Sequence, residues 1–169
     1  MRSVQVRDLE GKDLDVVAAF YAQGVLMQIP PGSKASLEEL TAIMKMDLEL
    51  FLKKKGNRNV WLAVENGVVK GIIDFFVEPP QIRIRFLGAI PTGKGTGTLL
   101  LLHVGQLYFS KDISIITAEV SKSDSRAWSF YFNHIGFEDQ GVCTKEPGLT
   151  LHLAVIAPQT LLFNIQKSH

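Results

Sequence analysis

Three glycines at every second position mark the segment of this chain that is best suited to chemistry. Gly93, Gly95 and Gly97 lie in a turn, Gly88–Thr98, between an alternating strand pattern and an apolar helical pattern. Glycine lets a backbone turn sharply and approach a ligand closely, and a helix start leaves about four N–H groups unpaired beside a partial positive charge. Lys94 adds a cation. This glycine turn, Gly88–Thr98, therefore predicts a binding site for a phosphate or a diphosphate.

Two phosphate-binding designs fit the glycine turn. The residues from Gly88 to Lys94 satisfy the G-x-x-x-x-G-K pattern of a nucleotide-kinase P-loop, with Thr96 as a magnesium ligand. The residues from Thr92 to Gly97 instead resemble the R/Q-x-x-G-x-G/A element of the GNAT acetyltransferases, which in that family holds the pyrophosphate of acetyl-CoA. The first design implies phosphoryl transfer and the second implies acyl transfer.

The surroundings of the turn favour the second design. Phosphoryl transfer needs cations around the transferred group, yet Arg126 is the single arginine after the turn. A nucleotide kinase usually places its P-loop after the first strand, whereas the glycine turn lies past the midpoint of the chain. No apolar strand pattern ends in an aspartate that could hold magnesium.

A second segment supports acyl transfer. A strand expected at Ile113–Val120 is followed by Ser125–Phe137, a short helical pattern with several aromatic residues that ends in Gly136-Phe137. This segment resembles the second GNAT signature, in which a short helix carries an aromatic pair and ends in x-G-F. Because both motifs occur in the family's order and at its separation, the chain resembles a divergent member of the GNAT superfamily.

The resemblance implies acetyl-CoA as the cofactor and a primary amine of a small molecule or peptide as the acceptor. It also implies that the apolar segment Gly24–Ala35 shapes the acceptor site. Backbone N–H groups around Leu87–Ala89 would hold the developing oxyanion. Ser125 and the aromatic residues Phe130–Phe132 would lie beside the pantetheine and its sulfur. The predicted cofactor-binding residues are Leu87, Gly88, Ala89, Thr92, Gly93, Lys94, Gly95, Thr96, Gly97, Thr98, Ser125 and Phe132.

The chain departs from the family pattern at several positions: the family's usual Asn falls on Ser125, its small residue falls on Trp128, and two further departures bear on the site. Thr92 stands where the family has Arg or Gln. Counted back from Gly136, the tyrosine that serves as general acid in the family falls on Phe132. A one-residue adjustment of the helix would bring Tyr131 to that position instead. We therefore predict Tyr131 as the general acid. A general acid contributes about 10²–10⁴-fold, and a thiol pKa near 8.5 lets the thiolate leave even without one.

The acceptor amine must lose a proton before it attacks the thioester. Glu119, near the end of its strand, is the predicted base, and Asp74 and Glu78 are further candidates. Each of these carboxylates also suits a solvated strand position. The histidines are scattered and show no metal-ligand spacing, so no metal site is predicted.

Two further functions stay open besides acetyl transfer. The departures at Thr92 and Phe132 are also compatible with a catalytically impaired protein of the GNAT fold. Such a protein would act as a CoA-binding or regulatory module and would not turn over acetyl-CoA. The P-loop nucleotide kinase is the third hypothesis.

Composition excludes several other classes of partner. Among 169 residues, 18 Lys and Arg balance 17 Asp and Glu, which argues against a nucleic-acid partner. The single cysteine, Cys143, excludes an internal disulfide.

No apolar run approaches the roughly 20 residues of a membrane span, and the first residues lack the apolar core of a signal peptide. We therefore expect a cytoplasmic protein with no membrane partner.

The remaining patterns predict the elements that position these residues. Ser36–Glu39 forms a capping box before a helical pattern, and Asn66-Gly67 predicts a hairpin turn. Strands are expected at Val4–Arg7, Val60–Glu65, Val68–Val77, Gln81–Phe86, Ile113–Val120, Gly136–Cys143 and Leu149–Ile156, and helices at Asp13–Gln23, Ser36–Lys55, Thr96–Phe109 and Asp124–Asn133.

This order predicts a single α/β (α+β) domain over residues 1–169. Its mixed, largely antiparallel sheet would be flanked by helices, with a core at about 4–156 and a tail at 157–169. The tail carries Leu161–Phe163 and is expected to pack on the body or against a second subunit. A homodimer therefore stays open.

Overall fold

The computed structural model describes residues 3–28, 34–109 and 111–167, which form two compact units. One unit comprises Met1–Asp74 and Phe86–Leu100, and the other comprises Phe75–Arg85 and Leu101–His169. None of the helices in these ranges is long and apolar enough to cross a membrane. The organisation as one domain over the whole chain stays a prediction.

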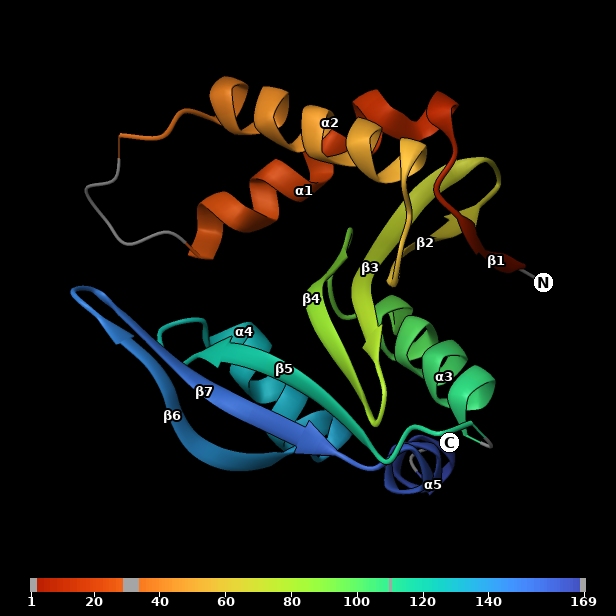
Figure 1. Ribbon diagram of the computed structural model, residues 1–169, viewed down its shortest axis with the longest axis vertical. Coiled ribbons are helices and arrows are strands. Elements are labelled where there is room, and N and C mark those ends of the chain that lie inside the picture. The colour runs from red at the N-terminus through yellow and green to blue at the C-terminus, as the bar shows by residue number, and fades with distance from the viewer. Residues whose placement is uncertain (1–2, 29–33, 110, 168–169) are drawn as a thin grey trace. The chain divides into compact units, whose positions relative to one another are not determined.

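Seven strands form one mixed sheet in the order β1-β2-β3-β4-β5-β7-β6 (Figure 1). Pairing is antiparallel for β1 with β2, β5 with β7 and β6 with β7, and parallel for β4 with β5. The mixed, largely antiparallel sheet predicted from the sequence is thus confirmed. The strands are β1 Val4–Asp8, β2 Arg58–Glu65, β3 Val68–Glu78, β4 Gln81–Ala89, β5 Ile115–Ser121, β6 Glu138–Glu146 and β7 Leu149–Ile156.

The helices follow the predicted order with two additions, a short 3₁₀ turn near the start and a helix in the tail. The segment after β5 combines one α-helical turn, α4, with a π-helical stretch, η2. The helices are η1 Gly11–Asp13, α1 Leu14–Gln28, α2 Leu37–Lys53, α3 Thr96–Tyr108, α4 Ser125–Trp128, η2 Ser129–Ile135 and α5 Pro158–Lys167.

Local sequence signals explain several element boundaries. The side chain of Ser36 accepts a hydrogen bond from the N–H of Glu39 at 3.1 Å, which caps the start of α2 as predicted. Asn66 and Gly67 both have positive φ, 54° and 76°, and join β2 to β3 in a tight hairpin. These boundaries depend on backbone conformation over a few residues, so the sequence is sufficient to place them.

The first helix is longer than the sequence predicts. The helical pattern was expected to end at Gln23, with an irregular acceptor segment at Gly24–Ala35, but α1 continues through Gln28. Gly24 serves packing rather than helix termination, because a Cβ there would lie 2.5 Å from the ring of Phe86. Residues 29–33 of the expected acceptor segment lie outside the described residues.

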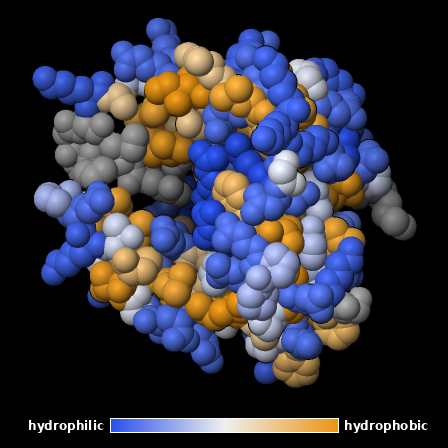
Figure 2. All heavy atoms as spheres, viewed as in Figure 1, coloured by the Kyte–Doolittle hydropathy of each residue, from blue (hydrophilic) through white to orange (hydrophobic). Residues whose placement is uncertain are grey.

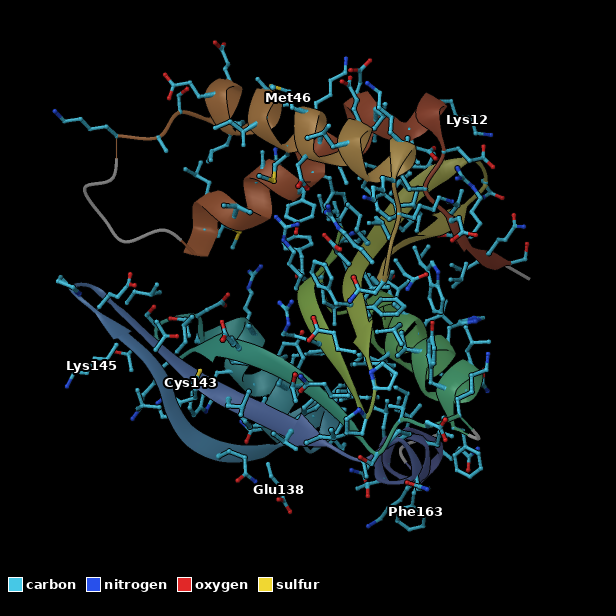
Figure 3. All side chains as sticks on the ribbon, in the orientation of Figure 1. Lys12, Met46, Glu138, Cys143, Lys145 and Phe163 are labelled. Atoms are coloured by element: carbon cyan, nitrogen blue, oxygen red, sulfur yellow. The ribbon has the colours of Figure 1, made fainter. Side chains whose placement is uncertain are left out.

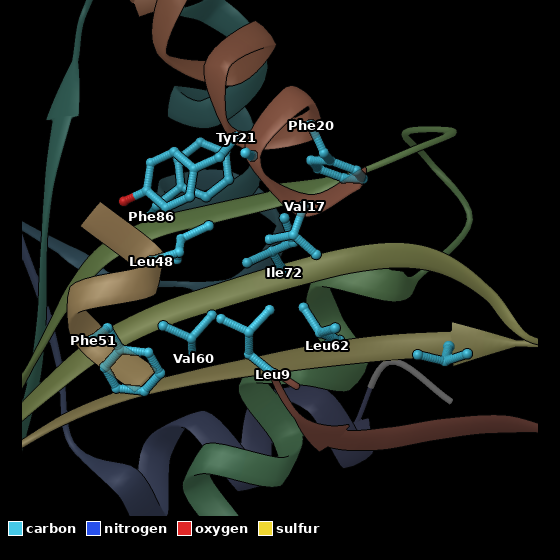
Figure 4. Packing of buried hydrophobic residues seen from close by; sticks show 12 residues of the cluster. Leu9, Val17, Phe20, Tyr21, Leu48, Phe51, Val60, Leu62, Ile72 and Phe86 are labelled. Atoms are coloured by element: carbon cyan, nitrogen blue, oxygen red, sulfur yellow. The ribbon is translucent and has the colours of Figure 1, made fainter. Parts of the chain in front are cut away.

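In the first unit, α1 and α2 pack on the sheet through one apolar cluster (Figure 4). Val17 from α1, Leu48 from α2, Leu62 from β2 and Ile72 from β3 are fully buried in it. Aromatic residues add to it, and the ring of Tyr21 stacks on Phe86 with centroids 4.2 Å apart. This cluster fixes both helices against β2, β3 and the end of β4.

A buried ionic network ties the same helices to β3. Asp74 is fully buried, and its two carboxylate oxygens accept hydrogen bonds from Arg58 at 2.9 and 2.7 Å, while Tyr21 donates to it at 3.0 Å. Arg58 also donates to Asp47 at 2.8 Å. Burial alone would lower the pKa of Arg58, but these hydrogen bonds raise its pKa above the usual value. The interpretation of Asp74 as a solvated strand carboxylate is therefore wrong.

In the second unit, the tail forms a helix that packs on its neighbours. Leu161 and Ile165 of α5 are buried. A Cβ at Gly105 of α3 would lie 3.1 Å from Leu162, and the amide of Asn164 donates to the carbonyl of Ile135 at 3.0 Å. The tail thus packs on the body, which is one of the two arrangements expected from the sequence.

The buried network predicts a large effect of Asp74→Asn on stability. Removal of one partner from a buried ion pair typically costs about 3–5 kcal/mol, because the other charge stays buried without compensation. We expect a loss of this size in the free energy of unfolding, measured by urea denaturation. The matched change Asp15→Asn removes an exposed partner of Lys45 and should leave this free energy nearly unchanged. Equal losses in both variants would contradict the assignment.

Candidate functional site

The glycine turn comprises the end of β4, the loop 90–95 and the first turn of α3. Gly93 and Gly95 have φ values of 78° and 81°, a conformation that L side chains rarely adopt. A Cβ at either position would meet nothing within 4 Å. Both glycines are therefore needed for the backbone path and leave the outer surface of the loop open to a ligand.

The first turn of α3 directs main-chain donors toward this loop. The N–H of Leu99 donates to the carbonyl of Gly95 at 2.9 Å and closes the turn. The N–H groups of Thr96 and Gly97 precede this first intrahelical bond, so the helix itself gives them no carbonyl four residues back. Together with the exposed side chain of Lys94, they give this end of α3 a positive potential that suits an anion.

The start of α3 packs closely against Gly71 of β3, and we call this contact the seat at Gly71. A Cβ at this position would lie 2.6 Å from Cγ2 of Thr96, 3.1 Å from Cδ1 of Leu100 and 3.2 Å from the carbonyl oxygen of Gly88. Only glycine therefore lets the start of α3 approach β3 and β4 this closely. Sequence reasoning missed this residue, although a glycine inside a strand pattern is a signal of close backbone approach.

The end of β4 has one edge that is not paired with β3. The N–H of Ile90 donates to the carbonyl of Lys70 on β3 at 2.9 Å. Because successive N–H groups of a strand point to opposite edges, those of Leu87 and Ala89 point away from β3. The ladder with β5 ends earlier, at the pair Ile84–Ala118. Leu87 and Ala89 can thus offer main-chain donors to a bound carbonyl group.

The ring of Phe86 anchors this strand end. It stacks on Tyr21 and fills the space over two glycines, because a Cβ would lie 2.5 Å from it at Gly24 and 2.9 Å from it at Gly88. Gly88 therefore belongs to β4 and to this packing. A P-loop would need its first glycine to open the loop, so the structure gives no support to the kinase pattern.

The predicted site residues divide between the two units. Leu87–Thr98 belong to the first unit and form one continuous segment. Glu119, Ser125, Tyr131 and Phe132 belong to the second unit. Ser125 is the exposed first residue of α4, and the half-buried ring of Phe132 lies 4.5 Å from that of Trp128.

The π-helical stretch η2 changes the register of its aromatic residues. The carbonyl of Tyr131 accepts from the N–H of Gly136 at 3.0 Å, five residues later, and from that of Phe137 at 2.9 Å. An α-helix would pair Gly136 with Phe132 instead. Relative to Gly136, Tyr131 therefore takes the place that a regular α-helix would give to Phe132. This is the one-residue adjustment that the sequence left open.

Tyr131 lies in an aromatic environment that keeps its hydroxyl protonated. Only 8% of the residue is exposed, and its ring packs edge-on against Phe130 and Phe137. Burial, with a smaller contribution from the negative charge of Asp124, raises the pKa of Tyr131 well above its usual value. The side chain can hold a proton at any physiological pH.

The carboxylate candidates for the base differ in their surroundings. Glu119 is exposed on β5, where its cross-strand partner is Leu153 of β7. The oxygens of Asp74 are occupied by Arg58 and Tyr21, so Asp74 is no longer a candidate. Glu78 forms an ion pair with Arg83 at 2.9 Å.

Sequence reasoning also missed a histidine–carboxylate pair. Nδ1 of His152 on β7 lies 3.0 Å from Oδ1 of Asp139 on β6, and its ring stands edge-on to Trp128. The hydrogen bond from the N–H of Gly141, followed by that with His152, lowers the pKa of Asp139. The pair depends on the bulged register of β6 with β7, which the sequence pattern does not indicate. Within the described ranges, no group of three His, Cys, Asp or Glu side chains could hold a metal ion.

Comparisons with solved structures identify the fold. The spermidine N-acetyltransferase from Vibrio cholerae, solved with CoA and spermine, is 16% identical, with a TM-score of 0.71 over 94% of this chain and 98% of that chain. The PaiA N-acetyltransferase from Thermoplasma acidophilum, solved with coenzyme A, is 18% identical, with a TM-score of 0.69 over 89% and 98% of the two chains. An acetyltransferase of the GNAT family from Streptococcus pneumoniae is 19% identical, with a TM-score of 0.62 over 92% and 99%. This chain has the GNAT fold.

Comparisons of the amino-acid sequence, unlike those of the structure, identify no relative. No family model matches the chain, and a search of curated proteins found no match. The GNAT fold predicted from two short motifs is thus confirmed by tertiary structure at identities below 20%. The two motifs behind that prediction are the glycine turn and the helical segment after β5.

The seat at Gly71 predicts that Gly71→Ala loosens the start of α3. The new Cβ would collide with Thr96, so the first turn must move away from β3. We expect the amide of Leu99 to exchange hydrogen at least about tenfold faster, which corresponds to about 1.4 kcal/mol in the local opening free energy. Gly11→Ala is the matched control, because a Cβ at Gly11 meets nothing within 4 Å. Unchanged protection of Leu99 would contradict the role assigned to Gly71.

Proposed function

We propose that this protein is an N-acetyltransferase that transfers an acetyl group from acetyl-CoA to a primary amine of a small molecule or a peptide. The observation that carries the proposal is the arrangement of the glycine turn. Two open glycines with positive φ, Gly93 and Gly95, lead into a helix start that is seated on Gly71 beside the end of β4. Neighbours of the same fold were solved with CoA, which supports the same cofactor here.

The residues of the turn suit a diphosphate. Main-chain N–H groups at the start of α3 can donate to phosphate oxygens, and the side-chain-free surfaces of Gly93 and Gly95 leave room for the backbone to approach them. Lys94 adds a positive charge. Thr92 replaces a longer cationic or amide side chain of the family pattern, so the main chain would supply most of the contacts.

Acetyl-CoA supplies an acetyl thioester, and this chain's residues would act on the charges that develop as the amine attacks it. The N–H groups of Leu87 and Ala89 would donate to the carbonyl oxygen as it gains negative charge. Tyr131 would donate its proton to the sulfur of the departing thiolate, which requires a protonated hydroxyl. The raised pKa of Tyr131 keeps it in that state.

Glu119 would accept the proton that the acceptor ammonium must lose. Its exposed position on β5 leaves the carboxylate accessible to a substrate, in contrast to the buried and occupied Asp74. The Vibrio cholerae neighbour was solved with spermine, which supports a small amine as acceptor. The acceptor class proposed here is a primary amine.

The burial of Tyr131 also favours a second candidate function. A residue that is only 8% exposed offers less of its side chain to a substrate sulfur than an exposed one would. A CoA-binding module of the GNAT fold that does not turn over would retain the glycine turn and bind CoA. Binding and turnover therefore have to be measured separately.

The first experiment tests the glycine turn by calorimetry with CoA and acetyl-CoA. We expect the wild type to bind both, and Gly95→Trp to bind at least about tenfold more weakly, equivalent to about 1.4 kcal/mol. Gly56→Trp is the matched control, because Gly56 also has positive φ and open space around its Cα. An absence of heat with both ligands in the wild type would refute the proposal, and binding of ATP–Mg alone would favour the kinase.

The second experiment tests Tyr131 by measuring release of the CoA thiol with a panel of amines. Tyr131→Phe should lower kcat by about 10²-fold or more without weakening CoA binding, because only the proton donor is lost. Tyr108→Phe removes a hydroxyl elsewhere in the same unit and should leave kcat unchanged. Tight CoA binding with no turnover on any amine would favour the non-catalytic module.

The pH profile gives an independent check on Tyr131. An acid must be protonated, so its contribution is lost as pH rises through its pKa. Because the pKa of Tyr131 is raised, wild-type kcat should not fall as pH approaches about 10, where an ordinary tyrosine ionises. A falling limb below that pH that disappears in Tyr131→Phe would contradict the assigned environment.

A further inference from the structure

The outer face of α2 carries an apolar stripe that the core does not use. Ile43, Met46 and Leu50 are 54%, 64% and 63% exposed. Their spacing of three and four residues places them in one line along the helix. We refer to these three residues as the outer stripe. Figure 3 labels Met46 on α2, and Figure 2 shows hydrophobic residues among hydrophilic ones over this part of the first unit.

The outer stripe lies about 120° around the helix axis from the side of α2 that packs on the sheet. The buried side is formed by Leu40, Leu48 and Phe51. At 3.6 residues per turn, the outer stripe and the exposed residues in line with it span an arc of only about 80°. In the described part of the chain, the outer stripe is therefore a second apolar face that is left to solvent.

Charges of opposite sign end this line at equal distances from its centre. Glu39 lies seven residues before Met46, and Lys53 lies seven residues after it, about 10 Å away in each direction. Both residues are exposed. Ile43 and Leu50 occupy the positions between, at three residues before and four residues after Met46. The line is thus acidic at one end, apolar in the middle and basic at the other end.

We propose that α2 is a dimer interface, on which the α2 helix of a second copy of this chain docks antiparallel across a two-fold axis at Met46. Two-fold symmetry places the N-terminal half of the line in one copy against the C-terminal half of the line in the other copy. Met46 then meets Met46 of the second copy, Ile43 meets the copy's Leu50, and Glu39 meets the copy's Lys53. Each apolar residue gains an apolar neighbour and each charge gains an opposite charge.

The pattern favours a second copy over other occupants. An anionic membrane surface would attract a face that is basic throughout, whereas this line carries Glu39 as well as Lys53. An unrelated helix would need no symmetry about Met46. The equal spacing of opposite charges suits an antiparallel copy of the same line. The charges also suit the dipole of α2 itself, so the charge-reversal experiment below must separate the two roles.

The size of the stripe predicts a reversible dimer. Three apolar side chains from each subunit bury much less than the roughly 1,600 Å² of a standard stable interface. We therefore expect a monomer–dimer equilibrium that shifts toward the dimer as protein concentration rises. The surface lies on residues that have no part in the proposed acetyl transfer, so the two proposals can fail independently.

Sedimentation of the full chain over a wide concentration range tests the interface. We expect a concentration-dependent dimer in the wild type and a monomer in Met46→Glu, which places two like charges at the axis. Phe163→Glu is the matched control, because Phe163 on α5 is 64% exposed and lies outside the interface. A wild type that is monomeric at every concentration, or a dimer that persists in Met46→Glu, would overturn the proposal.

Charge reversal tests the antiparallel register. Glu39→Lys alone and Lys53→Glu alone should each weaken the dimer, because each places like charges opposite each other. The double variant should restore the dimer, although it reverses the favourable charges at both ends of α2. Loss of the dimer in the double variant as well would show that the proposed pairing is wrong.

Cross-linking tests the position of the axis without relying on dissociation. In a Cys143→Ser background, Met46→Cys should form a disulfide-linked dimer under mild oxidation. Met27→Cys, at a residue on α1 that is 71% exposed, should not. Equal cross-linking of both variants would contradict an axis at Met46. Thermal unfolding of each variant verifies that it is folded.

Discussion

The first turn of α3 rests on the backbone of β3, and this contact exists only because residue 71 is glycine. A Cβ there would lie 2.6 Å from Thr96 and 3.2 Å from the carbonyl of Gly88. The contact holds the start of the helix beside the end of β4. Main-chain donors from both elements thereby lie along one short segment. Because the charge of a helix end acts over only about one turn, the position of this turn decides whether it can hold an anion.

The opposite face of the same strands is held by aromatic and ionic contacts. Phe86 stacks on Tyr21, and Tyr21 donates to the buried Asp74, which also binds Arg58. A buried ion pair contributes little net stability compared with apolar residues of similar volume. Removal of only one of its two partners, however, strongly lowers the free energy of unfolding. The network therefore defines how α1 and α2 sit on β2, β3 and the end of β4. It also removes Asp74 from the acid–base chemistry, because its oxygens are already occupied.

The chemistry proposed for the second unit depends on one extra residue in a helix. The π-helical hydrogen bond from Gly136 to Tyr131 moves Tyr131 into the position that a regular α-helix would give to Phe132. The same packing buries Tyr131 among aromatic rings and raises its pKa. Register and burial therefore act together: one sets the position of Tyr131 relative to Gly136, and the other raises the pKa of its hydroxyl. Whether it reaches a substrate sulfur separates an enzyme from a binding module.

The sequence by itself determined the features that depend on a few neighbouring residues. The cap at Ser36, the Asn66-Gly67 turn and the positive φ of Gly93 and Gly95 all follow from local backbone energetics. The alternation of strand residues likewise predicted the order of elements and, with two motifs, the fold. Within the candidate site, the sharp backbone path of the glycine turn could be predicted in this way.

Tertiary structure alone decided the features that join residues far apart in the chain. The seat at Gly71, the burial of Asp74 and the pairing of His152 with Asp139 each bring together residues from separate elements. The close packing of Gly24 in α1 against the ring of Phe86 on β4 likewise joins separate elements. Such contacts arise from packing and strand register. A glycine inside a strand pattern signals a close approach at that position, but no local pattern names the partner element.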